Sequence, residues 1–221
     1  MRGPMSRFLP LFAVLLAVAL ATFSARPASA HQPYFEDTPF TPDAPFVVKD
    51  PSVSTAVYAT LDTPTDKDFY VFDGSEGDSI LLEMTIPQIA GQEDFAPTLA
   101  LVGPGLPPSA LPIAQPDGAG SLIIPPPDGT PKPFFEPFSR TSYWRRQSER
   151  VVLPATGRYT VVAWDPAGRV GRYVFVIGDR EIPGGDLAFP LKMRRYWTPL
   201  PAQDPAPAAT PTSARDAWWR G

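Results

Sequence analysis

Proline is the residue that most limits how this chain can fold. The 221 residues include 31 prolines. Proline lacks a backbone donor and breaks helix interiors, so this content disfavours long helices. It favours short elements joined by stiff loops. We therefore expect an all-β chain whose strands lie between proline-rich turns.

Strand patterns occur between these prolines. Apolar and β-branched residues alternate, and glycine, proline or aspartate separates one run from the next. Such spacing is typical of antiparallel β structure. The expected strands cover residues 53–61, 66–74, 79–86, 98–102, 120–124, 149–154, 157–164 and 171–177.

The last two of these runs, in "GRYTVVAWDPAGRVGRYVFVIG", indicate a hairpin around a turn at residues 165–168. Proline and glycine occupy turn positions that suit their backbone preferences. Both faces of each strand are apolar, with Tyr159 and Val161 on one strand and Phe175 and Ile177 on the other. We expect this hairpin to be central and covered on both sides.

The chain divides into four parts by composition. Residues 31–52 form an extended lead-in anchored by aromatic side chains, and residues 53–197 form the β-sandwich domain. Within that domain, residues 104–137 are predicted to be a long proline-rich loop, apart from the short strand expected at 120–124. A short helix capped by Asp186 is expected near its end. Residues 198–221 are rich in proline and alanine and are predicted to be disordered.

Residues 1–30 have the organisation of a secretory signal. Two arginines precede an uncharged run of 16 residues (8–23), and Ala28 and Ala30 fit the small-residue cleavage rule. The run is shorter than the ~20 residues of a membrane span. We predict cleavage after Ala30 and an extracytoplasmic protein with no membrane span after signal removal. An uncleaved anchor is the alternative.

Charge and cysteine content exclude several classes of function. Three arginines and no acid lie in residues 1–30, so the rest has 16 basic and 23 acidic residues, a net charge of −7. Such an acidic chain is a poor candidate for binding nucleic acid or anionic lipid, because both are also negatively charged. The absence of cysteine excludes thiol chemistry and cysteine-based metal sites.

Several motifs carry a family resemblance. "DKDFYVF" at residues 66–72, a Gly-Asp turn at 77–78 and a G-x-Y-x-V strand from Gly157 resemble the bacterial pre-peptidase C-terminal (PPC) domain. The resemblance covers about residues 53–178, and other stretches resemble exported bacterial proteins of unassigned function. It implies a jelly-roll-like antiparallel β-sandwich, and some members of the family bind calcium or an extracellular polymer. The middle loop of this chain is longer than in that family.

The stretch "FFEPFSRTSYWRRQSER" is the strongest binding candidate. Aromatic rings beside polar groups suit sugars or peptides. The ligand-binding candidates are Glu136, Tyr143, Trp144 and Arg145. The favoured alternative is that these aromatics cover a sheet end, with Arg145 or Arg146 pairing with Glu136.

Metal sites have weaker support. Asp66 and Asp68 supply the hard oxygen ligands that calcium prefers, but aspartates are also ordinary turn residues before a strand. We favour the turn interpretation and expect no cofactor, with calcium as the alternative. His31, the one histidine, would chelate Cu(II) from a new N-terminus with help from Glu36 or Asp37. The simpler interpretation is a residue exposed beside the cleavage site.

We therefore predict a secreted, non-catalytic binding or structural module at the bacterial cell exterior. Its partner would be an extracellular polymer or an envelope protein. The alternative is a metal-dependent or carboxylate-based enzyme on the same scaffold, although no G-x-S-x-G motif is present. The carboxylates available to such an enzyme are Glu36, Glu83, Glu93, Glu136 and Glu149. A third class is an assembly component that packs on a partner chain.

Overall fold

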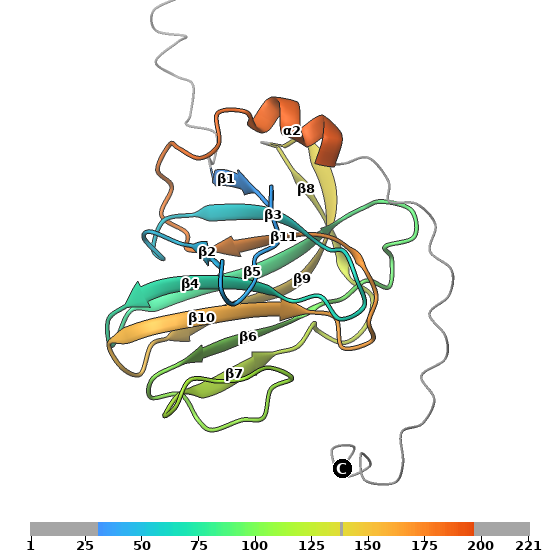
Figure 1. Cartoon of the computed structure of the whole chain (residues 1–221). Helices are drawn as coiled ribbons and strands as arrows, with labels where there is room; N and C mark the ends of the chain where they lie inside the picture. The colour runs from blue at the N-terminus through green and yellow to red at the C-terminus, as the bar shows by residue number, and fades with distance from the viewer. Residues whose placement is uncertain (1–30, 138, 197–221) are drawn as a thin grey trace, which may run out of the picture.

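The computed structural model describes residues 31–137 and 139–196 (Figure 1). The predicted signal and the predicted tail lie outside the described residues. The described elements are β1 (Gln32–Phe35), β2 (Phe46–Val47), β3 (Thr55–Leu61), β4 (Asp68–Gly74), β5 (Ser79–Pro87), β6 (Thr98–Gly103), β7 (Gly120–Ile124), β8 (Lys132–Glu136), β9 (Thr141–Val152), β10 (Gly157–Trp164), β11 (Gly171–Ile177) and α2 (Phe189–Tyr196).

Two facing sheets confirm the predicted all-β sandwich. One sheet has the order β1-β3-β11-β5-β9-β8, and the other has the order β2-β4-β10-β6-β7. Both sheets are mixed, because β1 runs parallel to β3 and β2 runs parallel to β4. The other strand pairs are antiparallel.

The predicted hairpin of the last two strands is wrong in its pairing. β10 pairs with β4 and β6, whereas β11 pairs with β3 and β5 in the other sheet. The turn at residues 165–168 exists, with Gly168 N–H donating to Asp165 O at 3.0 Å. The connection it begins crosses between sheets. Tyr159, Val161, Phe175 and Ile177 are all fully buried, as predicted, because each strand is central in its own sheet.

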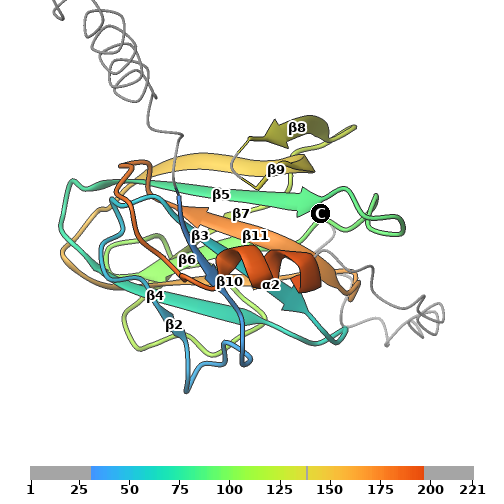
Figure 2. The same ribbon diagram turned by 90° about the horizontal axis from the view of Figure 1, so that it is seen from above.

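Each sheet is also covered on its outer face, which explains why its central strands are apolar on both sides. On the six-stranded sheet, Met193 of α2 packs with Val174 and Val176 of β11. On the five-stranded sheet, Leu111 and Ile113 of the proline-rich loop pack near β10. Figure 2 shows α2 lying over the first sheet, with β8 and β9 to one side of it.

The lead-in joins the edges of the two sheets. β1 extends the six-stranded sheet and β2 extends the five-stranded sheet. Between them Phe40 is buried, and its ring lies 5.6 Å from the ring of Tyr70 and 5.4 Å from that of Phe46. The predicted aromatic anchoring therefore takes the form of two short edge strands.

The region from residue 132 to residue 152 contains more strand than the sequence predicted. The run expected at 149–154 is the end of the twelve-residue strand β9, and β8 pairs with its first part. A register shift opposite β5 places Arg146 and Gln147 against the single residue Met84. This bulge puts two consecutive polar side chains in buried positions and breaks the alternation that marks a strand.

Candidate functional site

The sequence-predicted binding residues divide between the two faces of β9. Tyr143 and Arg145 lie on the outer face of the six-stranded sheet, beside Phe134 of β8. Trp144 lies half-buried and packs against the main core. The structure therefore brings Tyr143 and Arg145 together and separates Trp144 from them.

These outer-face residues line a pocket of about 190 Å³, here called the outer-face pocket. Its floor is apolar, formed by small and branched side chains of β3 and β11. Its walls carry polar and charged groups from β5, β8, β9 and the segment after β11. The residues that line it are His31, Ser54, Ala56, Tyr58, Leu81, Glu83, Thr85, Phe134, Glu136, Tyr143, Arg145, Val174, Val176, Gly178, Asp179 and Glu181.

Arg145 is held on this wall by two contacts. Its Nε lies 3.3 Å from Oε1 of Glu83, and its guanidinium carbon lies 4.7 Å from the ring centroid of Phe134. Glu136 accepts the backbone N–H of Ser139 at 2.5 Å. The predicted pairing of an arginine with Glu136 thus gives way to a pair with Glu83, which lies on the neighbouring strand β5.

Tyr143 supplies a hydroxyl at the base of the pocket. It is buried, and its hydroxyl lies 3.2 Å from Oγ of Ser139 and in hydrogen-bonding contact with Tyr58. Burial raises the pKa of both tyrosines. Both hydroxyls therefore stay protonated and can donate hydrogen bonds at neutral pH.

His31 lies at the rim of the same pocket, which the sequence did not predict. Its Nδ1 lies 2.5 Å from Oγ of Ser54. The carboxylates that share the pocket with it are on β5, β8 and the segment after β11 rather than at Glu36 or Asp37. Four acidic side chains and one arginine line the pocket, a formal charge of −3 with His31 neutral.

The aspartates proposed for calcium serve other contacts. Asp66 accepts the backbone N–H groups of Asp62 at 2.8 Å and Lys67 at 2.9 Å, which is turn chemistry. Asp68 is buried and accepts the hydroxyl of Tyr173 at 2.5 Å. Across residues 31–137 and 139–196, no three acidic or histidine side chains are grouped so as to hold a metal ion.

One carboxyl pair does form, between residues that the sequence had no reason to join. Glu36 and Asp68 lie in contact between the sheets, and neither lines the outer-face pocket. Burial, followed by the Coulombic effect of the partner, raises the pKa of Asp68 to about 9; burial also raises the pKa of Glu36 to about 7. The pair therefore holds a proton at neutral pH.

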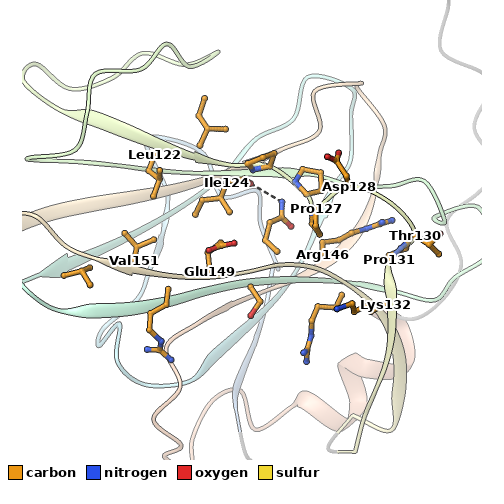
Figure 3. Close-up of a pocket in the computed structure, with 18 residues that line it drawn as sticks. Leu122, Ile124, Pro127, Asp128, Thr130, Pro131, Lys132, Arg146, Glu149 and Val151 are labelled. Atoms are coloured by element: carbon orange, nitrogen blue, oxygen red, sulfur yellow. Dashed lines mark hydrogen bonds between the residues drawn. The ribbon is translucent and has the colours of Figure 1, made fainter.

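A larger concavity of about 890 Å³, here called the edge groove, lies between β7 and β9 (Figure 3). Leu122 and Ile124 face Glu149 and Val151 across it. Gln147 donates to the carbonyl of Ile124 at 3.2 Å, the dashed line of Figure 3, and to that of Pro97 at 2.7 Å.

Arg146, the residue before Gln147 in β9, donates to the carbonyls of Glu93 and Phe95, at 2.8 and 2.7 Å. Arg150, at the far end of the groove, pairs with Asp179 on the outer face. Three polar side chains of the edge groove, Arg146, Gln147 and Arg150, are thus engaged in contacts within the protein. The outer-face pocket, whose acidic groups exceed its basic ones, is the better candidate for a ligand.

Comparisons with known proteins found likenesses among solved structures alone. No protein-family model matches the chain, and no curated protein sequence matches it. It is similar to the periplasmic g-type lysozyme inhibitor PliG of Aeromonas hydrophila, with 12% identity and a TM-score of 0.36 over 67% of this chain and 98% of that one.

Two further solved structures are similar. The pre-peptidase C-terminal domain of a Bacillus anthracis collagenase has 10% identity and a TM-score of 0.34, covering 62% of this chain and 97% of that one. CorA, a surface-associated copper-binding protein of Methylomicrobium album BG8, has 10% identity and a TM-score of 0.30, covering 69% of this chain and 100% of that one. The solved structures similar to this chain thus include a periplasmic protein, a pre-peptidase C-terminal domain and a surface-associated protein.

In the described part of the chain, no helix has the length and apolar character needed to cross a membrane.

Proposed function

We propose that this protein is an extracytoplasmic, non-catalytic binding module whose outer-face pocket takes a cationic group of an extracellular peptide or polymer. The observation that carries the proposal is the excess of acidic over basic side chains around an apolar floor. A lysine-like group matches this arrangement, because its stem is apolar and its end is charged.

The size of the pocket restricts the ligand. Drug-sized ligands occupy pockets of roughly 300–1,000 Å³, and this one measures about 190 Å³. It therefore suits a single side chain rather than a whole cofactor or a sugar chain. The rest of the ligand would lie on the surface around the pocket.

Electrostatics and aromatic rings both favour a cation. Glu136 lies in the pocket lining on β8, where its carboxylate would add a charge-assisted contact to the incoming ammonium group. Aromatic rings attract cations through their faces, as the Phe134 ring already does for Arg145, and Tyr143 adds a second ring to the same pocket. Charged groups in a concave site also raise the local concentration of oppositely charged ligands.

The test uses the full chain and two small probes, Nα-acetyl-lysine amide and its uncharged analogue Nα-acetyl-norleucine amide. Calorimetry should detect the charged probe and not the neutral one. Glu136→Gln should weaken binding by about tenfold to a hundredfold, since a charge-assisted hydrogen bond contributes ~1.5–3 kcal/mol. Glu76→Gln, which removes an exposed acid outside the pocket, is the matched control and should change nothing. Equal binding of both probes would reject the proposal.

A further inference from the structure

Glu36 ties the lead-in to the sandwich at the end of β1. Its backbone N–H donates to the carbonyl of Tyr58 at 2.9 Å, and its Oε2 accepts the backbone N–H of Thr60 at 2.8 Å. Its carboxyl group contacts that of Asp68, the first residue of β4. Because β4 belongs to the opposite sheet, this contact joins the lead-in and both layers of the sandwich.

Asp68 is the buried member of the pair. Its Oδ2 accepts the hydroxyl of Tyr173 at 2.5 Å, and that hydroxyl lies 2.6 Å from the hydroxyl of Tyr70. Its Oδ1 is buried and receives no N–H or O–H hydrogen bond from the described part of the chain. Two carboxyl groups in contact can hydrogen bond only if one of them is protonated. A proton shared with Glu36 supplies the partner that Oδ1 otherwise lacks.

The surroundings favour retention of that proton. The titratable and charged groups that face the pair come from the β3–β4 turn, β4, β11 and α2: Asp62, Asp66, Tyr70, Arg172, Tyr173 and Tyr196. The two additional carboxylates oppose a second negative charge. Tyr70 and Tyr173 are fully buried and Tyr196 is partly buried; desolvation raises the pKa of all three, so they are neutral. Arg172 interacts with Asp62 and the ring of Tyr196.

The opposite end of β1 reaches the outer-face pocket. His31 directly precedes β1 and lies against Ser54 at the pocket rim. β1 has four residues and sits at the sheet edge, where it pairs with β3 alone among the described strands. Short edge elements open at low free-energy cost.

We propose that Glu36 and Asp68 share one proton and act as a pH-sensitive latch that holds β1, and with it the His31 rim of the pocket, against the sandwich. When the proton leaves, two adjacent anions repel each other in a site shielded from water. Glu36 is the more exposed of the two, so it moves to solvent and releases β1 from β3. The consequence for the pocket rests on the proposed function, whereas the latch itself does not.

Hydrogen exchange of the full chain tests the latch directly. Protection factors, corrected for the intrinsic pH dependence of exchange, are measured from about pH 6 to about pH 9. Protection of the backbone amides of Gln32 and Glu36, which donate to the carbonyls of Ser54 and Tyr58, should fall about tenfold or more, while that of β10 should stay within about twofold. Glu36→Gln, which cannot ionise, should abolish the fall, and Asp68→Asn should do the same. Asp43→Asn removes an exposed acid of the same lead-in and should behave as the wild type.

Constant protection of β1 in the wild type, or an equal fall in both latch variants, would overturn the latch. A smaller loss of protection in Asp43→Asn than in the wild type would overturn it too, because the pH effect would then depend on the overall charge of the lead-in rather than on the carboxyl pair. Binding of Nα-acetyl-lysine amide is followed over the same range. Binding that persists while β1 loses protection rejects the link to the pocket. A probe that binds at no pH rejects the proposed function and leaves the exchange result to decide the latch.

Discussion

The two edges of the sandwich are closed by different means. At one edge the lead-in passes from β1 to β2, and Phe40 fills the space between them with its ring against Tyr70. At the other edge the chain also crosses between the sheets, from β7 through a proline-rich connection to β8. At this edge the space between the strands stays open and forms the edge groove. Arg146 and Gln147 hold the surrounding backbone by hydrogen bonds.

This difference separates two roles of edge structure. Aromatic burial at the first edge removes apolar area from water and so contributes directly to stability. Hydrogen bonds at the second edge replace bonds to water and contribute less in net terms, although leaving such groups unpaired is costly. We expect the lead-in edge to be sensitive to loss of packing, and the groove edge to tolerate changes of its exposed side chains.

The largest expected effect follows from removing the ring at the lead-in edge. Phe40→Ala should lower the free energy of unfolding by about 3–5 kcal/mol, as buried phenylalanine-to-alanine changes do. Ile123→Ala in β7, where the side chain is 42% exposed, should cost less than about 1 kcal/mol. Urea denaturation of both variants measures the contrast. Equal losses of unfolding free energy would mean that side chains at the two edges contribute equally to stability.

Trp144 gives the next largest effect and tests the division of the two faces of β9. Because it is half-buried against the core, Trp144→Ala should destabilise by about 2 kcal/mol, less than a fully buried tryptophan. Binding of the lysine probe should be unchanged, whereas Glu136→Gln should weaken it without loss of stability. A stable Trp144→Ala protein that no longer binds would place the ligand on the inner side of β9.

The carboxyl pair predicts a pH dependence confined to the lead-in edge. Burial raises the pKa of Glu36 to about 7 and that of Asp68 to about 9. The stability from the pair is therefore complete below the unfolded pKa values of about 4, and is lost as the pH rises through these folded values.

The thermal midpoint of the wild type should thus fall by roughly 2–4 °C for each kcal/mol lost between pH 6 and pH 9. Asp68→Asn keeps an acceptor for the Tyr173 hydroxyl and should show a flatter profile. Scanning calorimetry at several pH values provides the measurement. A midpoint that rises over this range would show that the pair is ionised in the native state.

The smallest effect is expected for the ion pair beside the edge groove. Nη2 of Arg150 lies 2.5 Å from Oδ2 of Asp179, but both side chains are about half exposed. Their coupling in a double-mutant cycle should be below about 1 kcal/mol and should weaken in salt. A larger coupling would mean that this pair helps to hold the groove side together.

The local sequence pattern predicted the positions of the strands well, because alternating apolar residues and turn residues can be recognised within short stretches of sequence. It failed for pairing, since apolar residues on both faces of β10 and β11 fit a hairpin and two central strands equally well. It also missed most of β9, where the bulge at Arg146 and Gln147 interrupts the alternation. No short-range pattern marks such a bulge before the partner strand is known.

The candidate site was predicted in part. Glu136, Tyr143 and Arg145 do line one pocket, because alternate residues of β9 share a face and β8 lies beside it. Trp144 was grouped with them by adjacency in sequence, although neighbours on a strand point to opposite faces. His31 joins the pocket, and Glu36 meets Asp68, only through contacts between segments far apart in the chain.

The crossing from β10 to β11 has a consequence for the order of assembly. β10 is the middle strand of the five-stranded sheet and β11 is one of the two central strands of the six-stranded sheet, so neither sheet has a complete centre until the last third of the chain is in place. Most strand pairs also join distant segments, a topology associated with slow folding. A nascent chain that ends before Gly171 therefore carries the flanking strands of both layers but cannot complete the larger one. Its apolar strand edges stay exposed until β11 arrives.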